Sequence, residues 1–90
     1  MVRLPRGGTV RVRVNFLRTE GIRLELNGAP EGIAIQDVEM VGGGVAIVLR
    51  ADGKVKAGLR GNLIVDAFVE RAGGRRQVLG TLPAIAFRVM

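Results

Sequence analysis

The chain has 90 residues, 48% of them hydrophobic, and its 14 basic and 8 acidic side chains give a net charge of +6. This length suits one domain with one core, and the hydrophobic content excludes a disordered tail. No apolar run reaches the roughly 18 residues of a membrane-spanning helix, and cysteine is absent, so we expect residues 1–90 to form one folded domain without disulfides or membrane insertion.

Alternation of apolar and polar residues begins at Thr9 and predicts two strands in the first third of the chain. Residues 9–16 form the first strand, with arginine and asparagine on its outer face. Its inward side chains are Val10, Val12, Val14 and Phe16. A second strand is expected over residues 22–26, before the turn residues 27–32. Its inward side chains are Ile22, Leu24 and Leu26.

The middle of the chain predicts a hairpin. Alternation runs through residues 33–41, but its register shifts by one at Gln36, which indicates a β-bulge or a break between two short strands. The glycines at 42–44 predict the hairpin turn, because glycine adopts positive φ without steric cost. The returning strand, residues 45–51, directs alternate side chains to the core and leaves the others outside. The inward residues are Val45, Ile47, Leu49 and Ala51, and the outward ones are Ala46, Val48 and Arg50.

The last part of the chain predicts three more strands. Residues 52–58 are polar and rich in glycine, so we expect them to connect two sheets. A long strand over residues 62–70 then leaves Phe68 on the outer face and turns Leu63, Val65, Ala67 and Val69 inward. After a turn at 72–74, strands follow at 75–79 and 85–89, the latter with Ile85, Phe87 and Val89 inward. Gly80 and Pro83 interrupt them, since proline donates no ladder hydrogen bond.

The fold class follows from this series of short strands. About seven strands separated by turn residues, without helical periodicity, predict an all-β domain. We favour a two-sheet antiparallel sandwich. A small β-barrel has the same alternation and stays open as the alternative.

Most catalytic chemistry is excluded by composition, because the chain contains no Ser, Cys, His, Tyr or Trp. Nucleophilic triads and the usual zinc sites need these residues. We interpret the pairs Asp37/Glu39 and Asp66/Glu70 as solvated outer-face residues and Asp52 as a turn residue, so a two-carboxylate hydrolase is the residual alternative. We therefore expect no enzyme activity, no cofactor and no metal.

Four arginines are the candidate anion-binding residues. Arg11 and Arg13 share the outer face of the first strand, and Arg75 and Arg76 adjoin on a later hairpin. Single-stranded nucleic acid also needs exposed rings for base stacking, and Phe68 is the one phenylalanine at an outward position. The alternative interpretation, which also applies to Arg23 and Arg50, is that Arg11 and Arg13 only keep an exposed sheet soluble.

A family resemblance runs through the middle of the chain. Leu26-Asn27-Gly28-Ala29-Pro30-Glu31-Gly32-Ile33, the glycine turn, residues 45–52, Gly58 and Asn62-Leu63-Ile64-Val65 resemble the immunoglobulin-like (fibronectin III-like) repeats of large exported bacterial proteins. Residues 82–87 are similar to the last strand of such repeats. The resemblance covers roughly half to two thirds of the chain. It brings no site residues, and the chain lacks the cysteine pair and core tryptophan of antibody domains.

This resemblance implies an immunoglobulin-like sandwich excised from a longer polypeptide and located extracellularly, in the periplasm or on the cell surface. The function we expect is a non-catalytic structural or binding module with a spacer, adhesion or accessory role. Its partners would be neighbouring domains of the same polypeptide, another protein or a glycan. The alternative is a small basic β-barrel that binds nucleic acid or another polyanion through its arginines.

Overall fold

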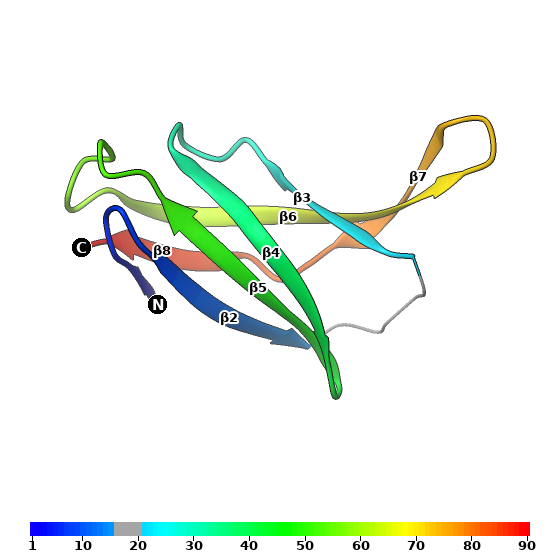
Figure 1. Ribbon diagram of the computed structural model, residues 1–90, viewed down its shortest axis with the longest axis horizontal. Helices are drawn as coiled ribbons and strands as arrows, with labels where there is room; N and C mark the ends of the chain where they lie inside the picture. Colours follow the sequence, from blue (N-terminus) through cyan, green and yellow to red (C-terminus); the bar gives the residue numbers. More distant parts are fainter. Residues whose placement is uncertain (16–20) are drawn as a thin grey trace.

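Eight strands and no helix form among the residues that the computed structural model describes, 1–15 and 21–90. The strands are β1 (Val2–Leu4), β2 (Thr9–Asn15), β3 (Arg23–Asn27), β4 (Ile33–Val41), β5 (Gly44–Ala51), β6 (Arg60–Arg71), β7 (Arg75–Thr81) and β8 (Ile85–Val89). They make two sheets, and β2, β4 and β5 cross in front of β6 and β8 in Figure 1. The predicted all-β sandwich is confirmed.

The smaller sheet has the order β2-β5-β4, and both of its ladders are antiparallel. Strands β4 and β5 form the predicted hairpin, with Val41 paired to Gly44 across the turn. The predicted register shift is also confirmed between Ile35 and Asp37, and because β4 continues through it, the shift is a bulge and not a break between two strands. The barrel alternative is wrong, since no ladder between described strands joins β2, β5 or β4 to the other sheet.

The larger sheet has the order β1-β8-β6-β3, with β7 also paired to β6. The first residues of β6, from Arg60 to Leu63, pair with β8, and Asp66 to Arg71 pair with β7. Strands β7 and β8 therefore follow one another along the same side of β6. Residues 82–84 separate them, as Pro83 predicted, and the Leu82 amide donates to the Val65 carbonyl across the break at 2.9 Å.

Strand β1 is the element that the sequence did not indicate. It pairs with β8 in parallel, in contrast to the antiparallel ladders elsewhere in the described sheets. The chain then crosses to the smaller sheet, where the Gly7 amide donates to the Ala51 carbonyl at 2.9 Å and the Ala51 amide donates to the Gly8 carbonyl at 3.1 Å. With three residues and one buried side chain, Leu4, β1 is too short to produce a clear alternation.

The core lies between the two sheets and consists mostly of the predicted inward residues. Its largest fully buried side chains are Phe87, Leu4, Ile47, Leu49, Leu63, Val45, Val65 and Val89. Val10, Val12, Leu24 and Leu26 are half-buried against it, and Phe16 lies outside the described residues. Connecting residues 52–58 contribute one further core side chain, Val55.

Two residues predicted to face outward are buried, so the expectation that they are exposed is wrong, and the reason is the same for both. Ala46 is 1% exposed because its single methyl group lies in register between the long side chains of Arg13 and Glu39. Phe68 is 6% exposed because Arg76 stacks on its ring. Alternation assigns a side chain to a face of the sheet, but neighbours on that face can still cover it.

Candidate binding surfaces

The structure divides the four predicted anion-binding arginines between the two sheets. Arg11 and Arg13 lie on β2 of the smaller sheet, and Arg75 and Arg76 lie on β7 of the larger one. Arg11 and Arg13 share one face of β2, whereas Arg75 and Arg76 are successive residues of β7 and point to opposite faces, so the four arginines do not form one basic stripe.

Both arginines of β2 have partners on the smaller sheet. The Nη2 atom of Arg11 lies 2.9 Å from the Oε2 atom of Glu39, so the ion pair spans β5 from one edge strand to the other. Arg13 donates to the carbonyl oxygen of Gly42 at the β4–β5 turn. The side chains of Arg11 and Glu39 are 59% and 48% exposed, so this pair contributes little stability. The negative charge of Glu39 nevertheless balances the positive charge of Arg11 on the outer face of the smaller sheet.

A hollow of about 400 Å³ lies over β3, β6 and β7, and polar side chains of all three strands meet in and around it. Glu25 and Arg76 form an ion pair there, with Oε2 and Nη1 2.5 Å apart. The guanidinium carbon of Arg76 also lies 4.0 Å from the centre of the Phe68 ring. Arg76 is thus engaged by a carboxylate and an aromatic ring at once.

Asp66 is the second carboxylate of this hollow, and its two oxygens accept hydrogen bonds from different strands. Asn27 Nδ2 donates to Oδ2 at 3.1 Å, and Thr81 Oγ1 donates to Oδ1 at 2.9 Å. Glu25 of β3 lies in register with Asp66 of β6. The network joins β3, β6 and β7 outside the core. Sequence reasoning assigned Asp66 to a solvated face and did not predict this network. The alternation already placed Glu25, Asn27 and Asp66 at outward positions, and that pattern could have indicated it.

The phenylalanines do not form a platform for stacked bases among the described residues. Phe68, predicted as the one outward ring, is covered by Arg76, and Phe87 is 1% exposed in the core. Both rings are therefore closed to a nucleobase in this arrangement.

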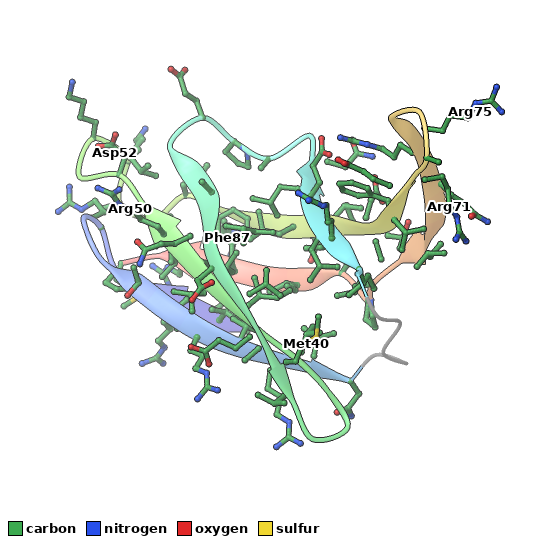
Figure 2. All side chains as sticks on the ribbon, turned by 45° about the vertical axis from the view of Figure 1, so that its right-hand side comes forward. Met40, Arg50, Asp52, Arg71, Arg75 and Phe87 are labelled. Carbon is green, nitrogen blue, oxygen red and sulfur yellow. The ribbon has the colours of Figure 1, made fainter. Side chains whose placement is uncertain are left out.

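The β6–β7 hairpin extends beyond the rest of the larger sheet and ends in arginines, as Figures 1 and 2 show. Arg71 and Arg75 lie in register across its turn, and Arg71 Nε donates to Gln77 Oε1 at 2.8 Å. Gly73 and Gly74 form the turn with φ values of +82° and +76°, which disfavour other residues.

The remaining acidic side chains that the structure describes do not gather into a metal site. Within residues 1–15 and 21–90, no group of three or more His, Cys, Asp or Glu side chains is close enough to hold an ion. Asp52 Oδ1 accepts the amide of Lys54 at 2.9 Å, which confirms its turn role. A second hollow, of about 470 Å³, lies beside Val12 and Ile85. A third, of about 370 Å³, lies beside Asp52 and Val55.

Comparisons with known proteins return no match: no family model, curated protein or solved structure is similar to this chain. In the part of the chain that the structure describes, no helix has the length and hydropathy needed to cross a membrane.

Proposed function

We propose that this chain is an immunoglobulin-like, non-catalytic module of an exported bacterial protein, with a structural or binding role. The strand order carries this proposal. Constant-type immunoglobulin domains place strands A, B, E and D in one sheet and C, F and G in the other. Here β2-β5-β4 corresponds to B-E-D, and β8-β6-β3 corresponds to G-F-C. Strand β1 corresponds to A, but it pairs with the last strand in place of β2.

The polar hollow of the larger sheet supports a structural role for its acids. Glu25 is neutralised by Arg76, and both oxygens of Asp66 accept hydrogen bonds from neighbouring strands. In the described structure protein side chains engage both carboxylates, and a general acid would have to give up these contacts to reach a substrate. These acids instead hold strands together, which favours a binding or spacer module whose partners are neighbouring domains, another protein or a glycan.

Cell fractionation tests this proposal on the native protein. An antiserum raised against the 90-residue chain is used to probe cytosolic, periplasmic, surface and secreted fractions of cells that produce it. We expect the antigen in an exported fraction, on a polypeptide much larger than 9.6 kDa. A cytosolic band of about that mass, with none in the exported fractions, would contradict the proposal.

A further inference from the structure

Three arginines form a row across the outer face of the larger sheet. Arg3 of β1 lies in register with Arg88 of β8, and Arg88 lies in register with Arg60 of β6. All three are exposed, whereas residues next to them in their strands, such as Leu4 and Val89, are buried. The row therefore points to solvent from three adjacent strands. At the usual strand spacing it extends over about 10 Å.

Unlike Arg11 and Arg76, the three arginines of this row have no ion-pair partner among the described residues. No hydrogen bond or ion pair to another described side chain engages Arg3, Arg60 or Arg88. Strands β1 and β8 contain no acidic residue, and the next acid along β6 is Asp66, about 20 Å from Arg60 at the usual rise per residue.

Other like charges that meet in register have partners elsewhere. Arg71 faces Arg75 but donates to Gln77. Glu25 faces Asp66, but Arg76 pairs with the first and Asn27 with the second. The arginine row lacks such compensation in the described structure.

Like charges directly opposite one another destabilise a sheet, so the row carries an energetic cost that solubility alone does not require. A bound anion would remove this cost, because one anionic group can accept hydrogen bonds from two neighbouring guanidinium groups. We propose that Arg3, Arg88 and Arg60 bind an anionic polysaccharide, one that carries carboxylate or sulfate groups along an extended chain. This inference deepens the proposed function by naming a ligand class. It rests on the proposed function because such polymers occur where an exported module would be located.

The surroundings of the row favour a polysaccharide over a single-stranded nucleic acid. No aromatic residue lies in β1, and the ring of β8, Phe87, is buried, so neither strand offers an exposed ring to a base. Next to the row, Ala86 lies in register with Asn62. The small side chain keeps the surface flat, and the amide can hydrogen-bond to sugar hydroxyls.

Binding to labelled polysaccharides at two salt concentrations tests the row. The probes are heparin for sulfate groups, polygalacturonate for carboxylates, neutral dextran as a control, and single-stranded and duplex DNA. We expect the wild-type chain to bind at least one anionic polysaccharide but not dextran. The variant Arg3→Gln/Arg60→Gln/Arg88→Gln should bind at least about tenfold more weakly than the wild type. The slope of the logarithm of its binding constant against the logarithm of the salt concentration should be shallower by about 2.

A second triple variant separates the row from net charge. Arg50→Gln/Arg71→Gln/Arg75→Gln also lowers the net charge from +6 to +3. Arg50 lies on β5 of the smaller sheet, and Arg71 and Arg75, labelled in Figure 2, lie at the β6–β7 turn, at the end of β6 opposite to Arg60. We expect it to lose less than about threefold in affinity. Equal losses in both triple variants, or no polysaccharide binding by the wild type, would overturn the inference. Tighter row-dependent binding of DNA would overturn the ligand class.

The stability of Arg88→Gln gives a readout that needs no ligand. Removing the central arginine abolishes both like-charge pairs, so the melting temperature should rise at low salt, and the gain should shrink when salt screens the repulsion. Arg50→Gln serves as the control. A lower melting temperature for Arg88→Gln at low salt would refute the repulsion. Fractionation does not depend on these arginines, so failure of the row leaves the proposed function standing.

Discussion

The two hairpins of this protein have similar local sequences but very different surroundings. Each consists of alternating strands joined by a glycine-rich turn. Strand β5 is the central strand of its sheet and faces the larger sheet, so Val45, Ile47 and Leu49 are fully buried. Strand β7 has a paired neighbour on one side only, and Val78 is 64% exposed. Local pattern thus determines the hairpin, whereas the opposing layer determines how much stability its side chains contribute.

The same substitution at equivalent strands should give the largest contrast. Leu49 is 0% exposed in β5 and Leu79 is 39% exposed in β7. Leu49→Ala removes buried methyl groups and leaves a cavity, so it should lower the free energy of unfolding by about 3–5 kcal/mol. Leu79→Ala should cost less than about 1 kcal/mol. Urea denaturation followed by circular dichroism measures both. Similar losses would show that β7 is packed as tightly as β5.

The turn of the β4–β5 hairpin should show a smaller effect that depends on the position of the glycine. A Cβ atom at Gly44 would meet the carbonyl oxygen of Val14 and lie 3.0 Å from the Cα atom of Asn15, whereas one at Gly42 would meet nothing within 4 Å. Gly44→Ala must therefore push β2 away from β5, at a cost of about 1–3 kcal/mol. Gly42→Ala is the control and should stay within about 0.5 kcal/mol. Thermal denaturation measures the melting temperature of both variants. Equal melting temperatures would contradict the close approach of Gly44 to the backbone of Val14 and Asn15.

The sequence predicted most of the fold because both sheets depend on alternation and turn chemistry. The bulge at Gln36 and the break at Pro83 were visible as a register shift and a missing amide donor. Strand β1 was not visible, because its three residues pair with β8 from the far end of the chain. Such non-local pairing leaves no period in the local sequence.

The candidate sites could be predicted only in part, because charge complementarity depends on register between strands. The arginines of β2 and β7 were identified by their spacing, but their partners Glu39 and Glu25 come from other strands. Phe68 was assigned to the correct face, yet the position of Arg76 over its ring follows from the β6–β7 register. The arginine row was hidden for the same reason, since its members come from three strands.

The smallest effect should come from the contacts that Arg76 of β7 makes with Glu25 and Phe68. Arg76→Gln removes the ion pair with Glu25 and the stacking on Phe68. The side chains of Arg76 and Glu25 are 52% and 54% exposed, so solvent screens the pair and the stacking supplies most of the effect. We expect a loss of about 1 kcal/mol, or about 4–8 °C in melting temperature for a domain of this size.

Arg75→Gln is the matched control for Arg76→Gln, because Arg75 is exposed and the adjacent position carries the same side chain. Its melting temperature should stay within about 2 °C of wild type, since surface substitutions away from specific contacts change stability little. Melting in low and high salt then separates the two contributions of Arg76, because salt screens an exposed ion pair and leaves the ring covered. If Arg76→Gln melts like Arg75→Gln at both salt concentrations, the hairpin is held by its backbone ladder alone. If the loss of melting temperature in Arg76→Gln persists in high salt, the stabilising effect of Arg76 comes from its stacking on Phe68.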